Sequence, residues 1–298
     1  AEEASLEQRL SKLRKLITSP SSLRSMLQLP QQIRLPLPAQ RVRRPLPTLV
    51  IPDQPMAKNA RRRPLFFVPD WDDLVDPDYN FVEDTHPQGQ FDPLEQGVYA
   101  HEMFDQPPYD GILISRAVLD NSNPKKRQAF DRAHTFLRWP TDRKVMGDCG
   151  AFSYVNEEVP PYSTSDVLDY YERHGFDIGV SVDHLIVGDI IKNEAERERR
   201  FQLTLSNAEE FLSKHRAGSY HYAPMGIAQG WDPASYERAV VALLDMGYKH
   251  IALGGLAFNK SQEVVDILAR ISPHFPEDLY VHIFGLAREE LLEPYYRF

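Results

Sequence analysis

From residue 65 onward, short runs rich in β-branched, aromatic and aliphatic residues alternate with longer stretches in which apolar residues recur at helical spacing. This alternation predicts parallel strands joined by crossover helices. Each predicted strand is four to eight residues long. The seven strands are residues 65–69, 111–115, 144–147, 178–182, 221–228, 250–253 and 280–284.

The helical stretches carry their own start and stop signals. Asp232 can cap a helix whose first position is Pro233 and which Gly247 ends. Ser163 with Asp166 predicts a capping box for a helix that stops at Gly175, and Ser261 predicts a similar start for the next one. The Glu- and Arg-rich residues 193–215 predict a long solvated helix without catalytic meaning, and residues 125–138 predict another such connector.

Seven regularly spaced βα units favour a TIM-type (β/α)₈ barrel over an open doubly wound sheet. No Gly-x-Gly-x-x-Gly follows the first strand, which argues against a dinucleotide-binding half. Residues 288–297 predict the start of a seventh helix, and no eighth strand follows it. Because such a barrel leaves unpaired edges, we expect the closing strand beyond Phe298 or on another chain.

The composition fits one large α/β domain, since the 298 residues are 42% hydrophobic. The longest apolar runs are strand-sized and the N-terminus lacks a hydrophobic signal core, so we expect a cytoplasmic protein without a membrane span. Cys149 is the only cysteine, which excludes an internal disulfide and a multi-cysteine zinc cluster within these residues.

The charge is distributed unevenly, which separates a basic arm (residues 1–64) from the predicted barrel (residues 65–298). The arm has thirteen Lys or Arg against four Asp or Glu, a balance of +9, and the remainder carries −18. A short amphipathic helix is predicted near Leu6 and Leu10, followed by a proline-rich extended stretch. Arginines on such an arm can follow nucleic-acid phosphates; alternatively, the arm packs on its own acidic domain. These arginines are Arg41, Arg43, Arg44, Arg61, Arg62 and Arg63.

The carboxyl ends of the strands in a parallel barrel face one mouth, where barrel enzymes carry their chemistry. Two carboxylates, an amide and glycine turns at this mouth can recognise a guanine-like edge: carboxylates accept from N–H groups, and the amide or backbone donates to O6. Asp148 could instead cap a helix or fix its loop. The residues predicted at the mouth are Asp70, Asp72, Arg116, Asp148, Cys149, Asp183, His184, Gln229, Gly254, Gly255 and Leu256.

Four motifs at these strand ends resemble, in the same order, the successive signatures of the tRNA-guanine transglycosylases. They are GDCGAF from Gly147, VD from Val182, IAQG from Ile227 and LGGLA from Leu253. The sequence PDWDD from Pro69 and the runs VMGDCGAFSY and SVDH are most similar to DpdA, the branch of the family that exchanges guanine for a 7-deazaguanine in DNA. The resemblance covers residues 65–298 and leaves the arm outside.

The resemblance implies a pentosyltransferase that inserts a 7-deazaguanine such as preQ0 into DNA, or alternatively into tRNA, through a covalent glycosyl-enzyme intermediate. Other DNA-modification proteins are candidate partners. Asp148 would be the general acid/base. The base would be bound by Asp183, Gln229, Gly254, Gly255, Leu256, Phe152 and Cys149. The family's nucleophilic Asp and its zinc site would lie beyond Phe298, so no cofactor is expected in this chain.

This chain departs from the family pattern at Cys149, where Ser is usual, and at Ala151, where Gly is usual. These departures put the hydrogen bonding of that turn in question. Three alternatives stay open: a catalytically incomplete base-binding subunit, a Cys149 thiolate activated by His184, and a metal-dependent hydrolase that uses His184 with Asp183. The cluster around Asp70 and Asp72 could also hold a cation together with His86.

Overall fold

The computed structural model describes residues 49–52, 63–69, 74–87 and 89–298. Of these residues, 76–87 and 89–91 belong to one compact unit, and 49–52, 63–69, 74–75 and 92–298 belong to the other. The predicted helix near Leu6 lies outside the described residues, as do all arginines of the arm except Arg63.

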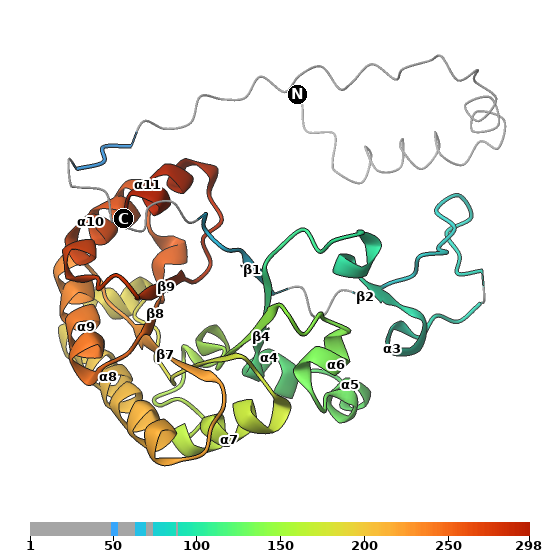
Figure 1. Cartoon of the computed structure of the whole chain (residues 1–298), viewed down its shortest axis with the longest axis horizontal. Helices are drawn as coiled ribbons and strands as arrows, with labels where there is room; N and C mark the ends of the chain where they lie inside the picture. The colour runs from blue at the N-terminus through green and yellow to red at the C-terminus, as the bar shows by residue number, and fades with distance from the viewer. Residues whose placement is uncertain (1–48, 53–62, 70–73, 88) are drawn as a thin grey trace, which may run out of the picture. The chain divides into compact units, whose positions relative to one another are not determined.

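The second unit is built around a curled sheet of seven parallel strands in the order β1-β4-β5-β6-β7-β8-β9 (Figure 1). Every predicted strand is confirmed. Each strand pairs with the next parallel strand along the chain, so all seven carboxyl ends meet at the same rim. The strands are β1 Phe67–Val68, β4 Gly111–Ser115, β5 Lys144–Asp148, β6 Ile178–Val180, β7 Ala223–Ala228, β8 His250–Leu253 and β9 Tyr280–Ile283.

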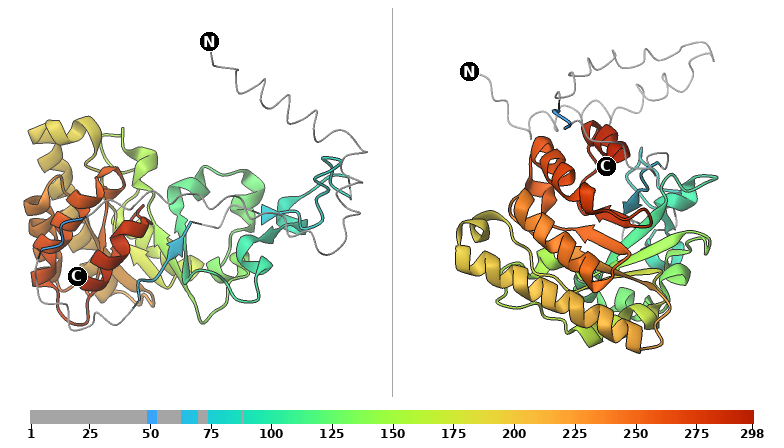
Figure 2. Two further views of the ribbon diagram at one scale, coloured as in Figure 1. Left: turned by 90° about the horizontal axis from the view of Figure 1, so that it is seen from above. Right: turned by 60° about the vertical axis from the view of Figure 1, so that its left-hand side comes forward.

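Four helices cover the outer face of this sheet (Figures 1 and 2). They are α7 Thr164–His174, α8 Glu194–Ala217, α9 Pro233–Met246 and α10 Ser261–Ile271. Two predicted starts are confirmed: the side chain of Ser163 accepts from Asp166 N, and that of Asp232 accepts from Ser235 N. Gly175 and Gly247 end their helices in the left-handed region, at φ +66° and +93°.

The predicted cap at Ser261 is wrong. Lys260 is the N-cap, and Ser261 is already the first helical residue. The carboxylate of Glu263 accepts from Lys260 N at 3.0 Å, while Ser261 Oγ donates to Glu290 at 2.7 Å. The serine hydroxyl is therefore used for a contact with the last part of the chain, which local sequence does not reveal.

The prediction that α8 is a solvated helix is wrong for one of its faces. Phe201, Ala208 and Phe211 are buried against the sheet, and Arg200 and Thr204 are buried with them. The helix begins as predicted at Asn193, whose side chain accepts from Glu196 N at 3.1 Å. One face of α8 is therefore part of the protein core, while charged residues on its other face are exposed to solvent.

The connector between β4 and β5 is more compact than predicted. It contains α4 Arg116–Asp120, α5 Pro124–Ala129 and α6 Ala133–Leu137 in place of one solvated helix over residues 125–138. Phe130 ends α5 with an extended backbone, and its ring is buried in contact with Phe136 and Phe176. Before this connector, a short antiparallel pair joins β2 Leu74–Val75 to β3 Val98–Tyr99, with α3 Pro93–Gln96 between them.

Large aromatic rings from outside the sheet occupy the space beside glycines in the strands. A Cβ added to Gly147 or to Gly179 would lie 2.3 or 2.4 Å from the ring of Tyr171. The inner side of the sheet is filled by a separate apolar cluster. Its buried members are Met146, Val180, Met225, Ile227 and Ala252.

The two edge strands of the sheet are β1 and β9. Among the described residues, no strand pairs with their outer edges, and an apolar groove of about 510 Å³ lies along both. Phe67 of β1 contacts His282 of β9 edge to face, with ring centroids 6.2 Å apart. The predicted last helix is present as a short 3₁₀ turn, Glu289–Leu291, followed by α11 Leu292–Arg297.

Part of the predicted arm packs on the barrel unit. Gln262 of α10 accepts from Val50 N at 2.8 Å and donates to Val50 O at 2.9 Å. Leu49 and Ile51 pack against the apolar cluster that includes this helix. None of the described helices is both long enough and apolar enough to cross a membrane.

Candidate active site

Asp148 is the last residue of β5 and stands at the rim where the strands end. Its Oδ2 accepts a hydrogen bond from Gly150 N at 3.0 Å. Gly150 has φ +83°, and a Cβ there would lie 2.3 Å from Ser115 Oγ, so both the backbone and the space require glycine. Burial raises the pKa of Asp148 to about 6, although backbone hydrogen bonds oppose this rise. The carboxyl group can therefore exchange a proton near neutral pH.

Asp183 and Gln229 form a buried pair beside it. Each residue is 1% exposed, and Gln229 Nε2 donates to Asp183 Oδ2 at 2.6 Å. Burial, followed by the negative charge of Asp148, raises the pKa of Asp183 to about 7. Two acidic groups thus lie near each other, with Asp183 buried and Asp148 partly exposed, and neither forms an ion pair with a cation of the described residues.

Two acceptors of this pair are left without a protein partner. Asp183 Oδ1 and Gln229 Oε1 are both buried and receive no hydrogen bond from the described residues. Buried acceptors without donors are costly, at about 1 to 3 kcal/mol each. A ligand that presents several N–H donors on one edge would satisfy them, as the amide and amine edge of guanine does.

The glycine turn after β8 fits closely against this pair. A Cβ on Gly254 would lie 2.2 Å from Gln229 Nε2, and one on Gly255 would lie 3.1 Å from Gln229 Oε1. Tyr236 of α9 donates its hydroxyl to Gly254 O at 2.6 Å. Leu256 is fully buried behind the turn. Larger residues at either glycine would therefore displace the amide of Gln229.

Two exposed phenylalanines face each other at the rim. Phe152 follows β5, Phe258 follows β8, and their ring centroids are 5.8 Å apart. Their exposed fractions are 54% and 70%, which is high for phenylalanine, and the two ring planes are tilted by 55° to each other. The sequence motif pointed to Phe152 but not to Phe258, for which the only available signal was an aromatic residue just past a glycine turn.

Cys149 faces away from the rim into the core. Its thiol is fully buried, 3.5 Å from Tyr171 Oη and 3.9 Å from Val180 O. Burial and the nearby Asp148 raise the pKa of the thiol well above its usual range, which disfavours a thiolate. The predicted contact between Cys149 and a base stays a prediction, and the structure gives this side chain a packing role.

The side chain of Arg116 contacts two tyrosine rings and an aspartate of its own helix. Its guanidinium lies over the rings of Tyr162 and Tyr170, at 4.2 and 4.8 Å, and Nε lies 3.5 Å from Asp120 Oδ2. The stacking identifies it as a cation–π anchor of α4.

His184 is fully buried against α8, where its backbone N–H donates to Thr204 Oγ1 at 3.1 Å. Burial, followed by the positive charges of Arg200 and Arg199, lowers the pKa of its ring to about 4. The ring is therefore neutral at neutral pH. No other described residue joins it and Asp183 in a set of three that could ligate a metal.

The remaining predicted residues lie elsewhere. Asp70 and Asp72 fall outside the described residues. His86 pairs with Asp76 at 2.6 Å within the Asp76–Phe91 unit, and the described residues hold no group of three His, Cys, Asp or Glu that could bind a metal. With a single cysteine in the chain, these residues do not fit a cysteine-rich zinc site.

Of the predicted nucleic-acid-binding arginines, the structure describes only Arg63. Its guanidinium makes a two-pronged contact with Asp110, with Nη1 2.8 Å from Oδ2 and Nη2 2.5 Å from Oδ1. This contact matches the alternative in which the arm packs on its own acidic domain. The arm's binding to nucleic acid stays a prediction.

Comparison with known proteins agrees with this geometry. The family model described as queuine tRNA-ribosyltransferase matches residues 109–293, a range that contains Asp148, Asp183, Gln229 and the Gly254–Gly255 turn. A DNA-guanine transglycosylase of Salmonella montevideo is 37% identical over 249 residues, which cover 78% of this chain and 59% of the relative.

Two further relatives are more distant. A tRNA-guanine(15) transglycosylase of Methanococcus vannielii is 22% identical over 182 residues, covering 58% of this chain and 27% of the relative. A queuine tRNA-ribosyltransferase of Chromohalobacter salexigens is 26% identical over 180 residues, covering 54% and 47%. The chain thus spans less than two thirds of the length of each of these relatives. Because the family model covers more than half of the chain, this protein belongs to the queuine tRNA-ribosyltransferase family, the tRNA-guanine transglycosylases.

Proposed function

We propose that this protein is a guanine transglycosylase that exchanges guanine in DNA for a 7-deazaguanine base. The observation that carries the proposal is the buried Asp183–Gln229 pair with two unpartnered acceptors, next to Asp148. Guanine and a 7-deazaguanine share the donor edge that these acceptors require, so one pocket can serve both the leaving and the incoming base.

Asp148 would handle the proton in both halves of the exchange. A nucleophilic carboxylate attacks C1′ of the target nucleotide, and the C1′–N9 bond breaks as Asp148 donates its proton to the departing guanine. The ionised Asp148 then takes the N9 proton of the incoming base, which attacks C1′ and releases the nucleophile. A pKa of about 6 lets Asp148 serve as acid first and base second near neutral pH.

We propose that the nucleophile is supplied by a strand outside the described residues. The support is the groove between β1 and β9, which is apolar and lies along two strand edges without partners among the described residues. A parallel strand placed there would end at the same rim as Asp148 and Asp183, opposite the Asp183–Gln229 pair.

DNA is favoured over tRNA because the relative named for DNA matches at 37% identity, against 22% and 26% for those named for tRNA. A guanine within duplex DNA would have to be flipped out of the stack, at a cost of a few kcal/mol. The facing rings of Phe152 and Phe258 offer stacking surfaces for the extruded base.

The test is base exchange in cells that express the full-length protein with its genomic partners. DNA and tRNA are digested separately and searched by mass spectrometry for deazaguanine nucleosides. We expect the modification in DNA with the wild type and none with Asp148→Asn. Modification confined to tRNA would replace the DNA assignment, and its absence from both polymers would refute the proposal.

A further inference from the structure

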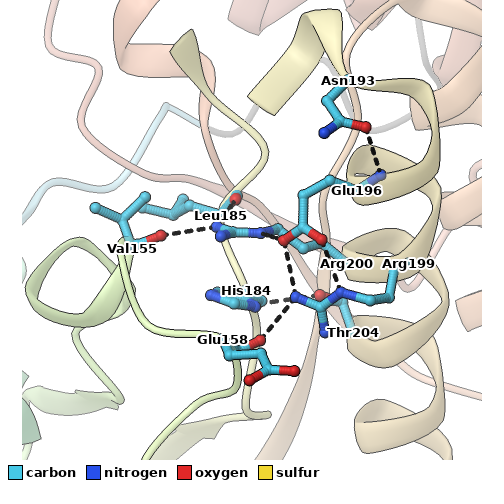
Figure 3. A network of polar contacts seen from close by, with 9 residues as sticks. All are labelled: Val155, Glu158, His184, Leu185, Asn193, Glu196, Arg199, Arg200 and Thr204. Atoms are coloured by element: carbon cyan, nitrogen blue, oxygen red, sulfur yellow. Dashed lines mark hydrogen bonds and ion pairs between the residues drawn. The ribbon is translucent and has the colours of Figure 1, made fainter. Parts of the chain in front are cut away.

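One face of α8 is turned toward the loops that follow β5 and β6 (Figure 3). Glu196, Arg200 and Thr204 occur at intervals of four residues, so they lie one above another on the same side of the helix. Arg200 and Thr204 are both buried. Polar groups at such positions need partners, and their partners identify what this face does.

Arg200 joins two separate loops to the helix. Its Nη1 donates to Val155 O at 2.9 Å and to Leu185 O at 2.9 Å, while Nε donates to Glu196 Oε1 at 2.6 Å (Figure 3). The residue is only 5% exposed. The pairing with Glu196 balances the charge of the guanidinium, which allows it to be buried among backbone carbonyls.

Both carbonyls belong to the loops that follow the site carboxylates, and Val155 is seven residues beyond Asp148. Val155 ends the turn Ala151–Tyr154 that follows Asp148. Leu185 is two residues after Asp183, and between them His184 N donates to Thr204 Oγ1 at 3.1 Å. A single helix face therefore binds both loops: the loop after Asp183 within two residues of that carboxylate, and the loop after Asp148 at the end of its turn.

We propose that Arg200 is a positioning residue that holds Asp148 and Asp183 in register with each other by tying the loops after β5 and β6 to α8. Its use in catalysis rests on the proposed function. Arg200 binds carbonyls and Glu196, so it acts on the placement of the loops. A lysine carries its three donors on a single nitrogen, so it cannot replace both Nε, which binds Glu196, and Nη1, which binds the two carbonyls.

The first test measures the loops directly in the full-length protein. Hydrogen–deuterium exchange is compared for the wild type, Arg200→Lys and Arg238→Lys. Arg238 is the control, because it also pairs with a glutamate of α8, Glu198 at 3.1 Å, but its side chain contacts α8 and Trp231 after β7 instead of the loops after β5 and β6. We expect residues 151–158 and 184–188 to exchange about 10- to 100-fold faster in Arg200→Lys only, as the loss of hydrogen bonds to a charged donor predicts. Unchanged exchange in these loops, in a folded variant, overturns the proposal.

The second test asks whether the placement matters for the reaction. Arg200→Ala should lower the rate of base exchange by about 100-fold, and added guanidinium ion at millimolar concentration should restore part of it. The same guanidinium should leave Arg238→Ala unchanged. If hydrogen–deuterium exchange of the loops becomes faster but guanidinium does not restore base exchange, Arg200 has only a structural role. That result would overturn its positioning role. If the wild type itself does not exchange bases, the proposed function fails. The hydrogen–deuterium exchange of the loops still decides whether Arg200 ties them to α8.

Discussion

Strand β6 has an aspartate at each end, and the two residues are in opposite situations. Asp177, just before the strand, accepts from His134 Nε2 at 2.8 Å, Val145 N at 2.8 Å and Lys144 Nζ at 3.1 Å. Burial alone would raise the pKa of Asp177, but these three contacts together lower it. Asp183, three residues after the strand, has one amide partner, and burial raises its pKa to about 7.

The difference shows how one strand separates stability from chemistry. At the amino end the carboxylate is fully partnered and joins three segments of chain, as an anchor should. At the carboxyl end a carboxylate is buried with too few donors, which is unfavourable unless a ligand supplies them. This division matches the general asymmetry of parallel barrels.

The largest effect should come from Asp148→Asn. An amide cannot donate and then accept the proton of a leaving base, so base exchange should fall by about 10²- to 10⁴-fold. Binding of the free base, measured by calorimetry, should change little. Asp177→Asn, which alters a carboxylate at the amino ends of the strands, is the control and should keep the wild-type rate. Exchange that survives in Asp148→Asn would remove Asp148 from the reaction.

The next largest effect concerns affinity. Asp183→Asn should weaken binding of a 7-deazaguanine base by about 10- to 100-fold, because an amide replaces an acceptor that faces the donor edge of the base. Titration calorimetry of the wild type, Asp183→Asn and Asp177→Asn measures this directly. Equal affinity in all three proteins would contradict base recognition at the carboxyl end of β6.

The pH dependence of stability should differ between the two ends. The pKa values of Asp148 and Asp183 are raised in the folded protein, so both groups favour the folded state below the unfolded value and this contribution is lost as pH rises from about 4 to 7. Asp183→Asn should therefore raise the free energy of unfolding at pH 8 by an amount on the order of 3 kcal/mol, with little change at pH 4. Denaturant titrations at the two pH values test this, and equal effects at both would argue against a raised pKa.

Asp177→Asn should do the reverse. Its pKa is lowered in the folded state, so its contribution is present above about pH 4 and is lost as the pH falls further. At pH 7 the substitution should lower the free energy of unfolding by about 1 to 3 kcal/mol, since it leaves charged donors without their acceptor. The melting temperature should fall while base affinity stays at the wild-type value.

The smallest effect is expected from Cys149→Ala. The thiol is a buried packing group, so the free energy of unfolding should fall by about 1 kcal/mol and the exchange rate should stay within about twofold of the wild type. Loss of exchange in a stable Cys149→Ala protein would instead restore the alternative in which this thiol takes part in chemistry.

Sequence was a good guide wherever a residue's neighbours along the chain determine its environment. The seven strands and the caps at Ser163 and Asp232 follow from local pattern, and the strand-end rule brought Asp148, Asp183 and Gln229 to one rim. A parallel sheet makes that rule strong, because the direction of every strand is the same.

The errors came from contacts between distant segments. Ser261 could not be excluded as a cap without knowing that Glu290 takes its hydroxyl. The buried face of α8 escaped notice because Arg200 and Glu196 look like surface residues unless the carbonyls they reach are known. Phe258 was missed for a similar reason: its partner Phe152 is more than a hundred residues away in the chain.

Two glycines beneath the ring of Tyr171 let it pack closely on both β5 and β6. The ring of Tyr171 lies across both Gly147 and Gly179, and its hydroxyl donates to Val180 O at 3.1 Å. Gly147 immediately precedes Asp148, and Gly179 stands four residues before Asp183. The ring of Tyr171 thus packs on both neighbouring strands that lead to the acidic groups, and its size helps to set the distance between these strands. A methyl group on either glycine would collide with this ring, so a change outside the rim would disturb the packing of the two strands that precede the carboxylates.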